Sequence, residues 1–362
     1  MGAFDAANMA LQACCGSGNA LIYDDTNMPS VMVYLPKMTY AQLGLGASTA
    51  THPAFIINGV EVDGIWISKY ENIIQNGRAY SLPGQLAKSN VTLANAMAAC
   101  AAKGAGWHLM TRAEYAALAL WSKANGTLPK GNNNNGKDIS ESVYQAIPAA
   151  WDGDGNITRT LTGSGPLDWS HNRAPGGVWD LNGDLWEWNA GVRVIYGELQ
   201  ILANNDAADT ENDQDAGSLL WRAIDGTTGA LITPDGSGTT ANSLKLDWVN
   251  NTWQWICGSI ASVQASGRLV AFETVTVDEA VCAEAVLLLQ ALGLYKYDTA
   301  GSAYGNAGFA WKNGEPEGIP VGGGRFNSGA NAGAFFLSGY YAGSFQNQYF
   351  GFRSAYAVLP EA

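Results

Sequence analysis

The sequence predicts an α+β fold that is rich in loops and has few helices. Three segments have apolar residues at helical spacing, whereas most other apolar runs are short and bounded by glycine, proline or asparagine. Glycine accounts for 44 of 362 residues, and charged residues make up 14%, well below the share of about a quarter that is usual in globular proteins. Helices and strands do not alternate as in a βαβ chain, and no segment repeats.

The first residues of the chain are expected to be an extension that precedes the main domain. Residues 1–28 are mostly small or polar and show little periodicity. We therefore expect residues 1–29 to form an N-terminal extension and residues 30–362 to form one large domain, because no proline-rich or serine-rich linker divides them.

Short strands are expected next. Residues 31–36 are apolar, β-branched or aromatic, and a proline ends them. Residues 54–58 and 65–70 are expected to form a strand pair, because the segment between them contains Asn58-Gly59 and Gly64, which favour turns.

Two apolar segments are expected to be helices. Residues 92–103 have apolar side chains at helical spacing and are followed by Gly104, a residue common just past the end of a helix. Residues 278–292 are strongly apolar, and Asp278 is expected to cap their first turn.

A helix between these two has the clearest start signal. Thr111 and Glu114 have the spacing of a capping box, and Tyr115, Leu118 and Trp121 then lie on one face of the helix.

Two polar segments are expected to be surface loops. Residues 122–138 contain the sequence Gly-Asn-Asn-Asn-Asn-Gly at 131–136, which is too polar and too short of side-chain volume to be expected inside the protein. Residues 204–215 are rich in Asp and Asn, so we expect them to form an acidic loop.

Composition excludes two classes of partner. The net charge of −13 and the pI near 4.6 repel a phosphate backbone, so we expect no nucleic-acid binding. No apolar run approaches the ~20 residues of a membrane span, and the N-terminus lacks the basic and apolar regions of a signal peptide. We therefore expect no membrane insertion. The location stays open, with a virion or a cell surface as candidates.

The cysteines and histidines show no catalytic or metal-binding pattern. The cysteines are odd in number and form no CxxC motif, which argues against a disulfide framework and a zinc site, and the histidines are far apart in the sequence. We expect reduced thiols and structural histidines at Cys14, Cys15, Cys100, Cys257, Cys282, His52, His108 and His171.

The segment from Arg325 to Arg353 has the most unusual composition in the chain. It contains nine aromatic residues, no charge between its two terminal arginines, and Asn, Ser, Gln and Gly in place of most aliphatic residues. Such mixtures are typical of binding surfaces, because Tyr and Phe offer rigid contact area while Ser, Asn and Gly give adaptable hydrogen bonds. The alternative is a buried core, but adjacent rings such as Tyr340-Tyr341 cannot both point inward from one strand.

This composition predicts a solvent-exposed face that binds a ligand. The candidate ligand-binding residues are Phe326, Asn327, Ser328, Asn331, Phe336, Ser338, Tyr340, Tyr341, Phe345, Asn347, Gln348 and Tyr349. The aromatic anchors with the best prospects are Tyr340, Tyr341, Phe345 and Tyr349. In contrast, the tryptophans are expected in the core at Trp179, Trp186, Trp188, Trp248, Trp253 and Trp255.

Four segments, in this order along the chain, resemble the C-type lectin fold of the formylglycine-generating-enzyme type. Residues 31–36 are similar to its opening strand, and residues 106–115 to its Arg-Leu-Pro-Thr-Glu-Ala-Glu-Trp segment. Residues 178–188 resemble its Asp-x-x-Gly-Asn-Val-Trp-Glu-Trp motif, and residues 351–353 match its closing Gly-Phe-Arg. The resemblance covers about residues 30–358 and implies a C-type lectin-like fold.

The C-terminal segment also resembles the variable region of diversity-generating retroelement proteins. In that family a retroelement changes adenines of Asn codons, and the resulting residues form a ligand-binding face on a lectin-fold scaffold. The resemblance implies a variable region at about 325–353 and a protein or glycan partner on a target surface. Gln346 and Gln348 cannot arise from an Asn codon, and Arg325-Phe326 replaces the expected Ser-Trp.

An oxidase function, like that of the formylglycine-generating enzymes, is the less favoured alternative. The resemblance implies a copper-binding cysteine pair near the C-terminus, but Ser328 stands at the corresponding position and no cysteine follows Cys282. Iron-dependent relatives need clustered histidines, which the sequence does not offer. We therefore predict that the protein is not an enzyme.

Calcium is the metal for which the sequence offers candidate ligands. Asp180, Asn182, Asp184 and Glu187 lie in one turn and can supply oxygen ligands to a structural calcium ion, although hydrogen bonds that hold the turn are the favoured interpretation. Residues 152–156 copy the start of an EF-hand loop that lacks its closing Glu. Calcium-dependent glycan binding stays an alternative function, and no other cofactor is predicted.

Overall fold

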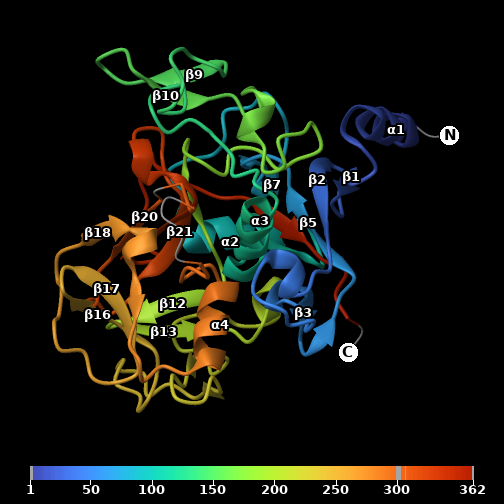
Figure 1. Cartoon of the computed structure of the whole chain (residues 1–362). Coiled ribbons are helices and arrows are strands. Elements are labelled where there is room, and N and C mark those ends of the chain that lie inside the picture. Colours follow the sequence, from blue (N-terminus) through green and yellow to red (C-terminus); the bar gives the residue numbers. More distant parts are fainter. Residues whose placement is uncertain (1–2, 299–302, 306, 361–362) are drawn as a thin grey trace.

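The computed structural model describes residues 3–298, 303–305 and 307–360 and shows a mixed α+β protein with long loops, as predicted (Figure 1). In these ranges the α-helices are α1 Ala3–Cys15, α2 Leu93–Ala101, α3 Arg112–Ala124 and α4 Ala283–Ala291. Short 3-10 helices lie at Ala41–Leu43, Pro53–Phe55, Leu167–Trp169, Asp206–Ala208, Phe272–Thr274 and Gly329–Asn331. None of the described helices has the length and apolar character needed to span a bilayer.

A five-stranded antiparallel sheet joins the N-terminal and C-terminal parts of the chain (Figure 1). Its strands, in spatial order, are β1 Asn19–Tyr23, β2 Pro29–Pro36, β5 Gly64–Ser68, β24 Ser354–Tyr356 and β8 Trp107–Leu109. β24 pairs with β5 on one side and with β8 on the other. The sheet is therefore continuous only when the C-terminal strand is in place.

Two larger sheets form the rest of the framework. A six-stranded sheet has the order β18 Arg268–Ala271, β20 Gly308–Trp311, β22 Gly333–Tyr341, β21 Ile319–Gly323, β11 Trp186–Trp188 and β23 Phe350–Gly351. A seven-stranded sheet contains β15 Leu231–Ile232, β14 Arg222–Ile224, β13 Glu198–Ile201, β16 Lys245–Val249, β17 Thr252–Ile256 and β19 Thr276–Val277, with β12 Val192–Ile195 paired to β13. Separate two-stranded ladders are β3 Ile56–Ile57 with β4 Val60–Glu61, β6 Ile73–Gln75 with β7 Arg78–Tyr80, and β9 Pro148–Trp151 with β10 Ile157–Thr160.

The N-terminal third differs from the sequence-based expectation in two ways. Residues 3–15 form α1, and β1 pairs with β2, so the sheet begins before residue 30. The predicted pairing of residues 54–58 with 65–70 is wrong, because β3 pairs with β4 while β5 pairs with β2. Asn58 and Gly59 both have positive φ, at 52° and 76°, which suits the tight two-residue turn between β3 and β4.

The three helices that were predicted lie close to their expected positions, with one error at a helix start. The capping box of α3 is present, since Thr111 Oγ1 accepts from the Glu114 N–H at 3.2 Å and the Glu114 carboxylate accepts from the Thr111 N–H at 2.9 Å. α4, however, begins at Ala283 and not at 278. Asp278 instead accepts a hydrogen bond from the Ala280 N–H at 3.0 Å, so it closes a turn ahead of the helix.

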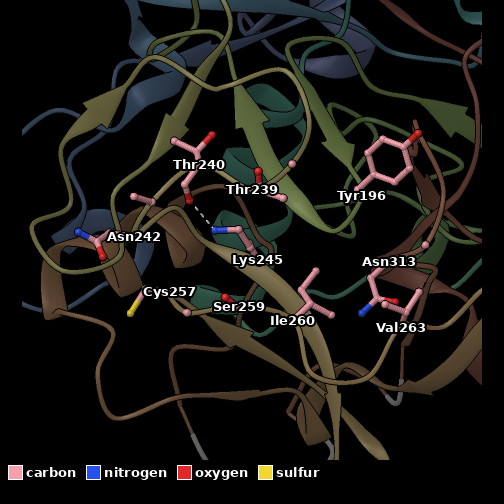
Figure 2. Close-up of a pocket in the computed structure, with 14 residues that line it drawn as sticks. Tyr196, Thr239, Thr240, Asn242, Lys245, Cys257, Ser259, Ile260, Val263 and Asn313 are labelled. Atoms are coloured by element: carbon pink, nitrogen blue, oxygen red, sulfur yellow. Dashed lines mark hydrogen bonds between the residues drawn. The ribbon is translucent and has the colours of Figure 1, made fainter.

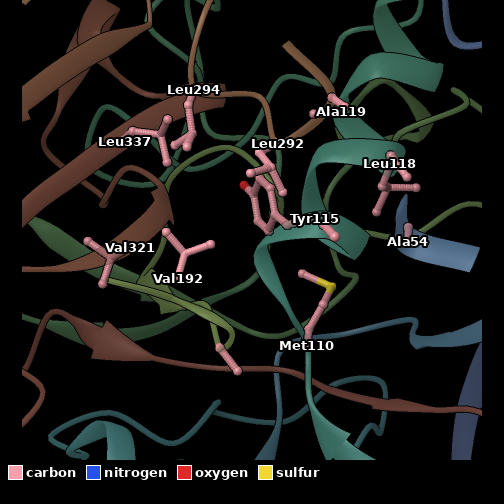
Figure 3. Packing of buried hydrophobic residues seen from close by; sticks show 14 of the residues in the cluster. Ala54, Met110, Tyr115, Leu118, Ala119, Val192, Leu292, Leu294, Val321 and Leu337 are labelled. Carbon is pink, nitrogen blue, oxygen red and sulfur yellow. The ribbon is translucent and has the colours of Figure 1, made fainter. Parts of the chain in front are cut away.

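α3 lies at the centre of the core. Figure 3 shows Tyr115, from this helix, among Val321 and Leu337 of the six-stranded sheet and Leu292 after α4. A Cβ atom at position 322 would lie 2.8 Å from the Tyr115 ring, so Gly322 lets β21 pass close to it. The predicted core tryptophans are buried at Trp179, Trp186, Trp188, Trp253 and Trp255, while Trp248 is half-buried.

Candidate functional site

A buried ion pair holds the C-terminal end of the aromatic segment. Arg353 is fully buried, and its Nε and Nη2 donate to the two carboxylate oxygens of Glu187 on β11, each at 2.7 Å. Its Nη1 and Nη2 also donate to the carbonyls of Ser68 and Trp179, each at 3.0 Å. Burial alone would lower the pKa of the Arg353 guanidinium, but the charge and hydrogen bonds of Glu187 raise it. The arginine therefore stays charged, and its partners fix it in one orientation.

A second buried carboxylate extends this network toward the asparagine-rich loop at 131–136. Asp184 accepts hydrogen bonds from Arg159 Nε at 2.7 Å, from Asn132 Nδ2 at 2.8 Å and from the Thr160 N–H at 2.9 Å. Charge-assisted bonds of this kind are the stronger ones in proteins, particularly where water is excluded. The carboxylate thus ties the loop to the turn that precedes β11.

The asparagine-rich loop is partly buried, contrary to the sequence-based expectation. Asn132 and Asn133 are each only 2% exposed. Asn133 donates to Asp138 at 2.7 Å and to Asn182 at 3.1 Å, and it accepts from the Ile139 N–H at 2.8 Å. A polar side chain is tolerated inside a protein when its donors and acceptors are paired, and these are. The expectation was wrong because it judged the loop by polarity and not by the partners within reach.

The same loop supports the start of the aromatic segment. The Gly329 N–H donates to the Asn133 carbonyl at 2.8 Å, and the Asn135 N–H donates to the Phe326 carbonyl at 2.7 Å. The Phe326 N–H in turn donates to the Asp184 carbonyl at 3.2 Å. Both ends of the aromatic segment therefore rest on one buried polar network.

Two carboxyl groups of this network bind protons more tightly than usual. Burial raises the pKa of Asp180 to about 7, against the hydrogen bond from the Gly163 N–H, which lowers it. Burial, together with the charges of Asp184 and Glu187, raises the pKa of Glu71 well above its ordinary value. A proton on either group removes one negative charge from this cluster of buried carboxylates.

The four candidate calcium ligands are engaged by protein groups. Glu187 and Asp184 are paired with the arginines described above, while Asp180 and Asn182 are hydrogen-bonded to backbone groups at 3.0 and 2.8 Å. Within the described ranges, no three His, Cys, Asp or Glu side chains are grouped so as to hold a metal ion. The favoured interpretation, that hydrogen bonds hold this turn, agrees with these contacts.

The aromatic segment forms a face on the six-stranded sheet. Alternate residues of β22, at 336, 338 and 340, line a shallow depression of about 280 Å³, whereas Leu337 points into the core (Figure 3). The depression is lined by Trp186, Leu269, Ala310, Arg325, Asn327, Ser328, Asn331, Phe336, Ser338, Tyr340 and Tyr341. Alternation thus divides residues 336–338 between this face and the core, while the adjacent Tyr340 and Tyr341 both line the depression.

Trp186 is the centre of the ring cluster beneath the face. Its ring is stacked on Phe336, with centroids 6.2 Å apart and an interplanar angle of 5°. Phe350, Tyr341 and Tyr349 surround it at centroid distances of 5.2, 5.8 and 6.0 Å. Rings that pack on one another lose little further freedom when a ligand binds, so this cluster is preorganised.

The predicted ligand-binding residues fall into three groups. The exposed ones are Asn327, Asn331, Phe345 and Gln348, and the half-buried ones are Ser328, Tyr340, Tyr341, Asn347 and Tyr349. Phe326, Phe336 and Ser338 are only 5%, 4% and 3% exposed, so the predicted solvent exposure is wrong for these three. Neighbouring rings cover two of them, since Phe336 lies under Trp186 and Phe326 lies 5.7 Å from Tyr349.

Sequence reasoning missed the two cations of the face. The Arg325 guanidinium lies over the rings of Tyr349, 4.0 Å from its centroid, and Trp186, at 4.8 Å. The Lys312 ammonium lies 4.0 Å from the centroid of Tyr340. The sequence marked Arg325 only as the boundary of an uncharged segment, and nothing local in the sequence connects Lys312 with residues of β22.

A separate hollow of about 510 Å³ lies beside the seven-stranded sheet, with Tyr196, Ile260 and Lys245 around it (Figure 2). Burial lowers the pKa of Lys245. Its ammonium donates to the Thr240 carbonyl at 2.7 Å and to the carbonyl and hydroxyl of Ser243 at 3.1 and 2.6 Å, which uses all three donors. This hollow therefore offers no free cation, and no residue of the predicted face lines it.

The five cysteines are free, and none of them lines the depression on the aromatic face. Ser328, the position where the oxidase resemblance implies a cysteine, lies at its edge. The face therefore presents rings, amides, hydroxyls and one guanidinium, which suit recognition through contact and hydrogen bonds.

No family model and no curated protein matches the chain. Among solved structures, PvdO from Pseudomonas aeruginosa is similar at a TM-score of 0.34 and 12% identity, over 94% of this chain and 98% of that one. The U1 and P3c variants of the Major Tropism Determinant are similar at TM-scores of 0.29 and 0.31 and 11% identity, over 90% of this chain. The chain spans 62% of the length of those two proteins. Likenesses at TM-scores this low leave the function to be argued from the geometry above.

Proposed function

We propose that this protein is a recognition protein whose C-terminal face binds a macromolecular target on a cell or particle surface. The observation that carries the proposal is the depression over β22, where aromatic side chains are mixed with Asn and Ser and aliphatic side chains are few. The protein acts by binding, without chemistry of its own and without a metal. A virion or a cell surface is the proposed location.

The proposed scaffold is a C-type lectin-like domain of the formylglycine-generating-enzyme type with a variable region at about 325–353. Its support is the buried network below the face, which holds both ends of the segment through Asp184, Asn133 and Arg353. A framework fixed in this way tolerates changes in the side chains that it displays. Diversification by a retroelement predicts a reverse transcriptase gene nearby and a near-copy of these codons that differs only at adenines.

Site-specific photo-cross-linking tests the binding face. A photoreactive residue replaces Tyr341, on the face, and in a matched control it replaces Leu219, which is 87% exposed and lies elsewhere. Each variant is irradiated with envelope fractions of candidate host cells. We expect one major adduct at position 341 that is missing at 219. Equal adducts at both positions, or adducts only at 219, would place the binding surface elsewhere.

Loss of binding must be separated from loss of fold. We expect Tyr341→Ala to abolish the adduct formed from a second photoreactive site at Asn327, while the thermal midpoint stays within a few degrees of the parent. Adduct formation that survives this substitution and also survives Tyr349→Ala would contradict a role for the rings.

A further inference from the structure

We infer that the face recognises an acidic protein partner, and that Arg325 binds a carboxylate side chain of that partner. This inference rests on the proposed function, since it names the chemistry of the ligand for the same face. It is carried by the position of the Arg325 guanidinium, which lies against two rings at the edge of the depression.

Arg325 is held in place by its backbone. Gly324, with φ at 86°, precedes it, and a Cβ atom there would lie 2.6 Å from that of Ala332, so only glycine allows this approach. The Arg325 N–H donates to Ser328 Oγ at 3.1 Å, and its carbonyl accepts from the Ser328 N–H at 2.9 Å. The side chain then extends over Tyr349 and Trp186. The guanidinium is thus oriented before any ligand arrives.

The donors of this guanidinium have no acceptor in the described part of the chain, which gives it neither an ion pair nor a side-chain hydrogen bond. The other cation of the face, Lys312, lies 3.6 Å from Glu315. The N–H donors of the planar Arg325 guanidinium are therefore free to bind a ligand at the depression. A carboxylate is the group that a guanidinium binds through two parallel hydrogen bonds. Asn327 and Asn331 are exposed and line the same depression, where they can form hydrogen bonds with the neighbouring backbone of a partner.

Charge also favours a localised acidic group. No acidic residue lies between Arg325 and Arg353, although the chain as a whole carries a net charge of −13. A polyanion would be repelled by the rest of the surface, whereas one or two carboxylates can approach the two cations of the face.

The shape of the face favours a protein over a sugar acid or a small molecule. The depression, of about 280 Å³, is smaller than the roughly 300–1,000 Å³ of small-molecule pockets. Its ring faces are largely covered, because Tyr341 stacks on Phe345 at 4.5 Å and Lys312 covers Tyr340, which leaves little flat surface for a sugar ring. Trp, Tyr and Arg are the residues that dominate the energetics of protein interfaces.

The test uses peptides as the probe. A phage library of random 12-residue peptides is selected on the whole protein, and the enriched peptides are synthesised together with versions in which each Asp or Glu is replaced by Asn or Gln. We expect enriched peptides to contain Asp or Glu and the amide versions to bind about tenfold more weakly. Arg325→Gln should weaken the acidic peptides about tenfold and leave the amide versions unchanged, while Arg325→Lys should lose part of the affinity because it keeps the charge without the fork.

Lys312→Gln is the matched control, because Lys312 is already near Glu315 and should change affinity less than Arg325→Gln. Enriched peptides that lack acids, and that lose affinity in Tyr341→Ala but not in Arg325→Gln, would overturn the carboxylate inference and leave the binding face intact. If uronate or sialyl oligosaccharides bind through Arg325 and no acidic peptide does, the inference that the partner is a protein is wrong. No enrichment of acidic peptides at all would also overturn it, whatever the outcome of the cross-linking.

Discussion

The two arginines that bound the aromatic segment have opposite surroundings. Arg353 is fully buried, and Glu187 and two backbone carbonyls accept its hydrogen bonds. Arg325 lies at the edge of a depression on two rings. The guanidinium of one arginine is paired within the protein, and that of the other has no acceptor in the described chain. The difference teaches that the charge of an arginine does not show whether it belongs to the framework or to the face, whereas the pairing of its donors does.

The largest effect is expected from removing the framework arginine. Arg353→Ala leaves Glu187 buried without its partner and should lower the free energy of unfolding by about 3–5 kcal/mol. Arg325→Ala, the matched control, removes an arginine that has no carboxylate partner in the described chain and should change it by about 0.5 kcal/mol. Denaturant unfolding of both variants measures the difference. Similar losses in the two variants would contradict the division into framework and face.

A second comparison lies within the face itself. Phe336 is 4% exposed beneath Trp186, so Phe336→Ala should cost about 3–5 kcal/mol of stability. Phe345 is 39% exposed, so Phe345→Ala should cost about 0.5 kcal/mol. Thermal unfolding of the two variants decides whether these rings differ as their burial indicates. If Phe345→Ala also collapses the transition, that ring belongs to the core.

The asparagine-rich loop offers a pair of adjacent variants. Asn133→Ala removes a buried amide and leaves Asp138 Oδ2 without its donor, while Oδ1 keeps its bonds from Ser140, which should cost about 1–3 kcal/mol. Asn134 is half-buried, and Asn134→Ala should be close to neutral. We also expect Asn133→Ala to change ligand binding in the folded protein. The side-chain hydrogen bonds of Asn133 hold in place the backbone carbonyl that accepts from the Gly329 N–H. Equal stability of the two variants would show that the network does not support the loop.

The framework also predicts a pH dependence. The pKa of Asp180 is raised from 3.8 to about 7 in the folded state, so between these pH values the folded chain holds a proton that the unfolded chain has lost. This group therefore makes the free energy of unfolding fall as pH rises from about 4 to 7. Asp180→Asn introduces a neutral amide that does not titrate, and asparagine tolerates the positive φ of 64° at this position. We expect the variant to gain stability over the parent as pH rises through this window.

Two histidines make the free energy of unfolding rise with pH, opposite to Asp180. The quantity to measure is therefore the difference in unfolding free energy between the parent and Asp180→Asn at each pH. Burial lowers the pKa of His52 to about 4 and that of His171 to about 3. Below pH ~6.5 the unfolded chain binds protons that these buried rings do not, so their contribution to stability rises with pH. Subtraction of the two unfolding profiles cancels this shared term. A flat difference between pH 4 and 8 would contradict the raised pKa of Asp180.

The smallest effect is expected from removing calcium. Because Asp184 and Glu187 are paired with arginines, chelation should leave the thermal midpoint and peptide binding unchanged. A thermal midpoint that falls on chelation and recovers when calcium is added would instead support a structural calcium site. Loss of glycan binding on chelation, with the fold intact, would favour the lectin alternative.

Local signals of the sequence predicted the helices best. The capping box at Thr111 and Glu114 depends on residues three apart, and the structure contains it. Asp278 carried a similar signal but closes a turn, because a single Asp can cap either structure. Pairing between distant segments was not predictable in this way, which is why the partner of β5 and the role of residues 19–23 in a sheet were missed.

The burial of individual residues in the aromatic segment did not follow from the local sequence pattern alone. The argument that adjacent rings cannot both point inward holds for Phe335 and Phe336, since Phe335 packs against Tyr304 with centroids 4.8 Å apart and Phe336 lies on the opposite side. The second side is nevertheless covered, because Trp186 comes from β11, far away in the sequence. Burial from such a neighbour leaves no signal in the local pattern.

The position of β24 makes folding depend on the reading frame of the codons that precede it. This strand lies between β5 and β8 and follows the aromatic segment in the chain. A stop codon or frameshift anywhere in 325–353 removes both Arg353 and β24, and so leaves a buried carboxylate unpaired and a sheet interrupted in its middle. Substitutions within the segment spare both. Folding therefore requires that the codons of the binding face are translated in frame to the end of that segment.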